Sequence, residues 1–188
     1  MPAEQFASVC LGIGLAAACG FRVFVPFLAV SLAARAGVVS LAPDFHWITS
    51  NPALVAFAVA TGLELIAYQV PWVDNVLDAV ASPAAVIAGI LLSASAISGM
   101  DPSLRWGLAL IAGGGIAGVF QGATALARLG STAATGGLAN PIVGLLESGT
   151  AVLIVLVALF VPVLAFVGVV GGTVMAVRRL RARRRAAA

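Results

Sequence analysis

Hydrophobic residues make up 62% of this 188-residue chain, and charged residues make up only 9%. In a soluble domain, roughly a quarter of the residues are charged. The sequence has no lysine, and its mean hydropathy is +1.13. Few side chains are therefore available to face water, and the composition predicts an all-α bundle of several transmembrane helices.

Positive charge is concentrated at the C-terminal end. Six of the ten basic residues lie after position 177: Arg178, Arg179, Arg181, Arg183, Arg184 and Arg185. Basic residues directly after an apolar span favour the cytoplasmic side and contact anionic lipid headgroups. We therefore expect one transmembrane domain, residues 1–177, and a basic cytoplasmic tail, residues 178–188. The same distribution argues against nucleic-acid binding.

The apolar stretches of the chain set the number of membrane crossings, since one crossing needs about 20 residues. The stretches are residues 6–36, 52–70, 83–100, 104–129 and 141–177. The first carries Gly20, Arg22 and Pro26 in its middle, and we expect it to be tilted, kinked or broken there. Residues 130–141 are irregular in composition, so their backbone must lie at an interface, inside protein or along water.

The last apolar stretch is 37 residues long and allows two interpretations. It forms either two spans that turn at Pro162, or a half-span over residues 141–149 followed by one long crossing. We favour the half-span, because no polar residue near Pro162 would hydrate a turn. With the tail inside, five crossings also place Arg35 and Arg105 inside, whereas six place both outside. We expect about five spans plus broken or re-entrant half-helices, with the N-terminus outside.

Small residues recur at four-residue spacing on two of the expected helices. Such faces let the backbones of transmembrane helices approach closely. We expect a tightly packed bundle or a homo-oligomer that uses a glycine zipper, with packing positions Gly114, Gly118, Gly122, Gly12, Ala16 and Gly20.

Charged residues inside apolar segments are the strongest functional candidates. A charge at the bilayer centre costs about 3 kcal/mol, so such groups should pair, line water or be neutralised. Candidates for substrate or ion binding are Arg22, Glu64 and Glu147, with Asn140, Gln69, Asp74 and Asp78 beside them. Structural roles compete: Arg22 would bond carbonyl groups at the kink, and Asp74 and Asp78 would form a solvated face near a helix N-terminus.

Signatures of enzymes, cofactors and metals are missing from the sequence. There is no phosphate-binding glycine loop, no HExxH and no CxxC, and His46 is the only histidine. We therefore expect no catalysis, no cofactor and no metal site.

Three motifs together resemble a known family. They are residues 14–26 (GLAAACGFRVFVP), Glu64 followed by residues 71–78 (PWVDNVLD), and residues 136–141 (GGLANP) followed by Glu147. This pattern is similar to the bacterial integral-membrane proteins catalogued as domain of unknown function 4126, over nearly the whole chain up to Pro162. The family often has a basic residue shortly before the Pro-Trp pair, where this chain has Gln69. The resemblance implies the bacterial cytoplasmic membrane and an unassigned activity.

Two functions fit these observations. The first is a small transporter or channel, in which broken helices and intramembrane ionisable residues meet near mid-membrane. The alternative is an accessory or scaffolding subunit of a larger membrane complex, in which the same charges form a buried structural pair. The two differ in whether Arg22, Glu64 and Glu147 converge on one polar site.

Overall fold

The computed structural model describes residues 3–70 and 73–186, and within them the chain forms helices and no strands. The expected all-α class is confirmed. In chain order, the elements are α1 (Ala3–Cys19), α2 (Phe24–Arg35), the 3-10 helix η1 (Pro43–Thr49), α3 (Asn51–Ala67), α4 (Val73–Ala96), α5 (Pro102–Leu108), the π-helix η2 (Ala109–Gly113), α6 (Gly114–Thr135), α7 (Asn140–Phe160) and α8 (Pro162–Ala186).

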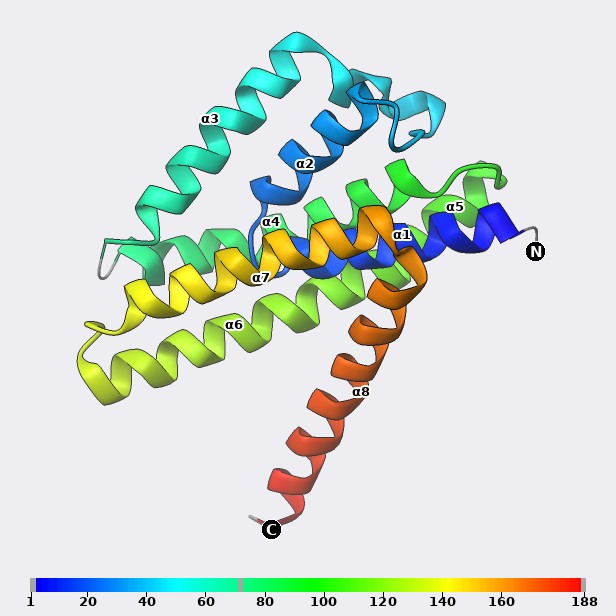
Figure 1. Ribbon diagram of the computed structural model, residues 1–188. Coiled ribbons are helices and arrows are strands. Elements are labelled where there is room, and N and C mark those ends of the chain that lie inside the picture. The colour runs from blue at the N-terminus through cyan, green and yellow to red at the C-terminus, as the bar shows by residue number, and fades with distance from the viewer. Residues whose placement is uncertain (1–2, 71–72, 187–188) are drawn as a thin grey trace.

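Helix α1 is the centre of the bundle (Figure 1). It packs against α4, α6, α7 and α8, and every residue from Cys10 to Cys19 is buried. Most of these residues are alanine, glycine or cysteine, so neighbouring backbones approach closely and gain dispersion contacts. The Ser93 hydroxyl on α4 adds a polar link, donating to the Gly12 carbonyl oxygen at 2.9 Å.

The small residues expected on α1 lie at helix contacts. A Cβ atom added to Gly12 would lie 3.1 Å from the Ser93 carbonyl oxygen, and one added to Gly20 would lie 2.7 Å from that of Ala117. Ala16 is fully buried between them.

The glycines at four-residue spacing on α6 do not form one continuous packing face. Gly114 and Gly118 face the side chains of Ile90 and Val86 on α4, whereas an added Cβ on Gly122 would have no neighbour within 4 Å.

The first apolar stretch is broken, as the sequence predicts. Helix α1 ends at Cys19 and α2 begins at Phe24, so Arg22 lies in the break. Pro26 lies in the first turn of α2, where backbone N–H groups have no partner within the helix and the missing donor costs nothing.

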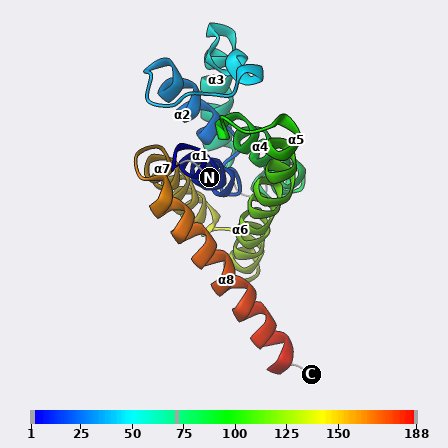
Figure 2. The same cartoon turned by 90° about the vertical axis from the view of Figure 1, so that its right-hand side faces the viewer.

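Helices α2, η1 and α3 form an arm beside the bundle (Figures 1 and 2). The main packing partners of α3 are α2 and η1. The arm is fastened at its η1 end, where Arg105 of α5 pairs with Asp44 at 2.5 Å and the Ala42 N–H donates to the Ser95 carbonyl oxygen at 2.8 Å. One face of α3 presents exposed apolar side chains, which are those of Val55, Val59, Leu63 and Ile66.

The expected half-span over residues 141–149 is wrong. Helix α7 is continuous from Asn140 to Phe160, and the chain turns at Pro162, where α8 begins. Two backbone hydrogen bonds hold this apolar turn. The Val161 N–H donates to the Val157 carbonyl oxygen at 2.8 Å, and the Leu164 N–H donates to the Val161 carbonyl oxygen at 3.0 Å. The turn therefore forms without a polar side chain, since these backbone hydrogen bonds hold it and Pro162 has no N–H that needs a partner.

Among the described residues, three helical segments are long and apolar enough to cross a membrane: Ala79–Ala96, Pro102–Thr135 and Asn140–Phe160. The pair η1 and α3, bent by 64°, would make a fourth crossing, compared with our expectation of about five. Helix α1 and the apolar part of α8 are shorter, because the breaks at Gly20 and Pro162 divide longer apolar stretches. Helix α6 continues to Thr135, so the irregular segment is limited to residues 136–139.

Candidate functional site

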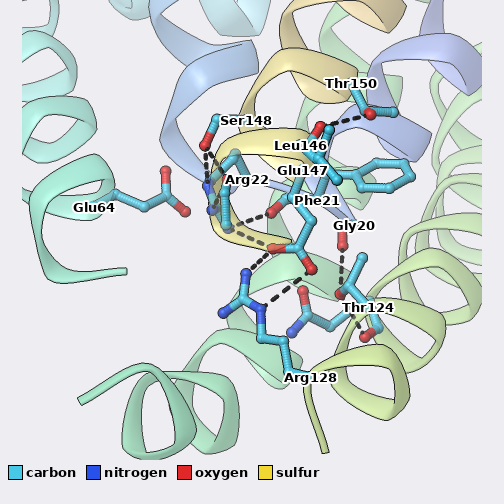
Figure 3. Close-up of polar contacts among 12 residues, drawn as sticks. Gly20, Phe21, Arg22, Glu64, Thr124, Arg128, Leu146, Glu147, Ser148 and Thr150 are labelled. Atoms are coloured by element: carbon cyan, nitrogen blue, oxygen red, sulfur yellow. Dashed lines mark hydrogen bonds and ion pairs between the residues drawn. The ribbon is translucent and has the colours of Figure 1, made fainter. Parts of the chain in front are cut away.

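Arg22 forms the centre of a buried polar cluster at the break between α1 and α2 (Figure 3). The residue is only 1% exposed. Its Nη1 donates to Glu147 Oε2 at 3.2 Å, its Nη2 to the Gly144 carbonyl oxygen at 2.7 Å, and its Nε to Ser148 Oγ at 3.0 Å. All three partners belong to α7, so Arg22 joins the break to that helix.

Arg128 on α6 binds the same carboxylate from a second direction. Its Nε donates to Glu147 Oε1 at 3.2 Å, and its Nη2 contacts Glu147 Oε2. Such a two-pronged contact uses the planar fork of the guanidinium and fixes the orientation of the carboxylate. Glu147 thus joins Arg22 in the helix break to Arg128 on α6.

Tyr68, just after α3, holds both arginines against one ring. The guanidinium carbon of Arg22 lies 4.1 Å from the ring centroid, and that of Arg128 lies 3.9 Å from it. Both guanidinium groups also bind Glu147 Oε2, so they lie next to each other beside the ring. Stacking on an aromatic ring stabilises a desolvated guanidinium.

Glu64 approaches the cluster from α3 (Figure 3). Its carboxylate accepts hydrogen bonds from the N–H groups of Val23, at 2.8 Å, and Phe24, at 3.0 Å. These are donors at the start of α2, where a negative charge is favoured. Glu64 therefore caps the N-terminus of α2, the second half of the broken helix.

The charges of the site balance only when all four groups are counted. Arg22, Arg128 and Glu147 carry a net charge of +1, and an ionised Glu64 brings the sum to zero. Glu147 lies seven residues after the start of α7, or about 10 Å along the helix from the turn between α6 and α7. At such depth an unpaired charge is expensive, which explains the dense pairing.

The remaining candidate residues either lie around this cluster or have side chains that the structure does not describe. Asn140 is buried at the start of α7, and its Nδ2 donates to Thr132 Oγ1 at 2.9 Å. Gln69 is half-buried after α3, and within the described residues no side-chain hydrogen bond joins it to the cluster. The structure does not describe the side chains of Asp74, Asp78 or the tail arginines after Arg178, which is itself exposed.

A cavity lies on each side of the cluster. The first, of about 340 Å³, is lined by Glu64 and Tyr68 together with apolar residues of α3 and α4. The second, of about 290 Å³, is lined by Glu147, Phe21 and residues of α6 and α7. The two carboxylates of the site therefore line two different cavities.

Sequence reasoning missed Arg128 and Tyr68 as members of the site. A usable signal existed for Arg128, which is nine residues before Gly137, whereas Glu147 is nine residues after Leu138. In two antiparallel helices joined at that dipeptide, residues at equal distances from the turn reach equal depth, which makes these two candidates for a pair. No comparable signal marks Tyr68.

Apolar helices of spanning length around a buried ionic cluster are the architecture of a helical membrane protein. The family model described as Domain of unknown function (DUF4126) matches residues 9–182, and the chain belongs to that family. No curated protein and no solved structure shows significant similarity to the chain. Among the described residues, no group of three histidine, cysteine or acidic side chains could hold a metal ion.

Proposed function

We propose that the protein is a small transporter or channel of the bacterial cytoplasmic membrane that carries protons across it. One observation carries the proposal: a buried cluster of ionisable residues at a helix break, with a cavity on either side. Broken helices with exposed ends are a common way for transporters to place substrates and coupling ions at membrane depth.

The residues divide into two roles. Arg22 and Arg128 each bind Glu147, and these three residues hold the break between α1 and α2 against α6 and α7. Glu64 carries the proton, since among the described residues it is the charged one that lines the first cavity.

The basic tail orients the protein in the membrane. We place the C-terminus in the cytoplasm, where Arg178 and the arginines that follow it contact anionic headgroups.

A scaffolding role is the second candidate, and a specific observation favours it. Helix α8 leaves the bundle and extends well beyond it, which presents a free surface for another protein (Figure 2). Affinity purification in mild detergent followed by mass spectrometry distinguishes a partner from a homo-oligomer. A stoichiometric partner that is lost when α8 is truncated after Gly172 would favour this candidate.

Proton movement through purified protein tests the transport proposal. Liposomes loaded with a pH-sensitive dye receive a potassium diffusion potential that drives protons inward. Wild-type protein should acidify the lumen faster than protein-free liposomes, and Glu64→Gln should remove the increase. Glu4→Gln is the matched control, because Glu4 is exposed near the start of α1. Equal rates for wild-type and protein-free liposomes would refute the proposal.

A further inference from the structure

We propose that the cavity beside Glu64 is a binding site for a lipophilic cation, a molecule with an apolar body and a quaternary ammonium or phosphonium centre. This inference rests on the proposed function, for which it names a substrate class. The cavity lies among the start of α2, the α3 helix and the α4 helix, and its volume of about 340 Å³ is that of a small-molecule site.

The lining of the cavity sets the character of the ligand. Among the described residues that line it, Glu64 is the only charged one, and Tyr68 the only other with a polar side-chain atom. The rest are apolar: Val23, Phe24, Ala60, Leu63, Ala67, Leu77, Val80, Ala81 and Ala84. Such a surface excludes a strongly hydrated solute and accepts an apolar body, because polar groups buried there would have few partners.

The carboxylate of Glu64 sets the sign of the charge. A carboxylate has about four acceptor positions, and the N–H groups of Val23 and Phe24 use two of them. Glu64 is also one of the residues that line the cavity, so its carboxyl group lies at the cavity wall. A cation placed there gains an electrostatic contact without disturbing the cap of α2.

The arginines do not reverse this preference. Arg22 and Arg128 are at most 2% exposed, neither lines the cavity, and both bind Glu147 behind the Tyr68 ring. Since the four charged groups sum to zero, the nearest one decides which ion is attracted. That group is Glu64.

The cavity also has a route of entry for a lipophilic ligand. Leu63 on α3 and Val80 on α4, both lining residues, are 63% and 66% exposed. The space between α3 and α4 therefore opens sideways. In a protein that spans the bilayer, this side faces hydrocarbon, where lipophilic cations concentrate.

Two probes of matched shape and opposite charge test the site. Tetraphenylphosphonium and tetraphenylborate are titrated into the purified, full-length protein in mild detergent, and binding is followed by calorimetry. We expect the phosphonium ion to bind at least about tenfold more tightly than the borate, and Glu64→Gln to weaken its binding by at least about tenfold. Equal affinities, or tighter binding of the borate, would overturn the proposal.

A second pair of variants covers the case in which Glu64→Gln fails to fold. Ala60→Phe fills the cavity from α3 and leaves the carboxylate in place, whereas Ala56→Phe adds the same ring at an exposed position on α3 outside the cavity. Only Ala60→Phe should abolish phosphonium binding; equal binding by both variants would place the ligand elsewhere and contradict the site.

The binding measurement and the proton-flux measurement fail independently. Phosphonium binding without proton flux would leave the site in place and remove the transport proposal. Proton flux without phosphonium binding would keep the transporter and overturn the proposed substrate class.

Discussion

Arg128 and Glu147 form an ion pair at equal distances from the turn that joins α6 and α7. The turn is tight, and Gly136 and Gly137 both have positive φ, which glycine adopts without strain. The pair therefore fixes how far the two helices slide past each other. Arg22 then joins this hairpin to the broken helix at the centre of the bundle.

Replacing Arg128 by methionine should strongly destabilise the fold. The change leaves Glu147 buried with one of its two partners, and breaking a buried pair costs about 3–5 kcal/mol. Thermal unfolding in detergent, followed by tryptophan fluorescence, measures the loss. Arg178→Met, at an exposed position, should leave the unfolding temperature unchanged. Similar unfolding temperatures for both variants would mean that the buried pair is absent.

Gly89 should tolerate no larger residue, although it lies outside the small-residue pattern. An added Cβ would lie 2.5 Å from Ala117 Cβ and 2.9 Å from the Gly113 carbonyl oxygen. We expect Gly89→Ala to cost about 1–3 kcal/mol through overpacking. Gly122→Ala meets open space and should be neutral or slightly stabilising, because alanine favours a helix. The opposite ranking in a thermal-stability assay would contradict the packing of α4 against η2 and α6.

Tyr68 should be replaceable by phenylalanine more readily than by leucine. Phenylalanine keeps the ring that stacks on both guanidinium groups, whereas leucine removes two contacts worth about 0.5–2 kcal/mol each. Unfolding temperatures of the two variants check this order. If leucine were tolerated as well as phenylalanine, the ring would not support the arginines.

A charge in the middle of α3 should impair membrane insertion. Val59 is the middle residue of this helix and is 58% exposed, so Val59→Arg places a guanidinium toward hydrocarbon at a cost of about 2.5–3.5 kcal/mol. Val38→Arg is the matched control, since Val38 is exposed in the loop after α2. The amount of each variant in the membrane fraction measures the effect. Normal insertion of Val59→Arg would show that this face of α3 does not meet lipid.

The sequence predicts the helical class, the break near Gly20 and the requirement that Arg22 find a partner. Composition determines the first two, and the cost of a buried charge determines the third. The position of the break in the last apolar stretch was wrong. That error arose from assuming that a turn needs polar side chains, whereas backbone hydrogen bonds hold the turn at Pro162.

The partners within the site depend on tertiary packing, which sequence spacing reveals only in part. Arg128 is not among the residues that the sequence analysis selects, although it and Glu147 are equally far from the turn between α6 and α7. Glu64 was expected beside the other charges, and the structure places it on the α2 cap, bordering its own cavity. No sequence pattern marks Tyr68 as a site residue, since its role depends on contacts with two arginines on distant segments.

A double-mutant cycle on Arg22 and Glu147 tests most directly that charges from separate helices meet inside the bundle. The stabilities of Arg22→Gln, Glu147→Gln and the double variant are measured by unfolding in the same detergent. The direct contact predicts that the two effects are non-additive, with a coupling energy of about 0.5–3 kcal/mol. Additive losses, with no coupling beyond experimental error, would contradict the buried cluster and the functions built on it.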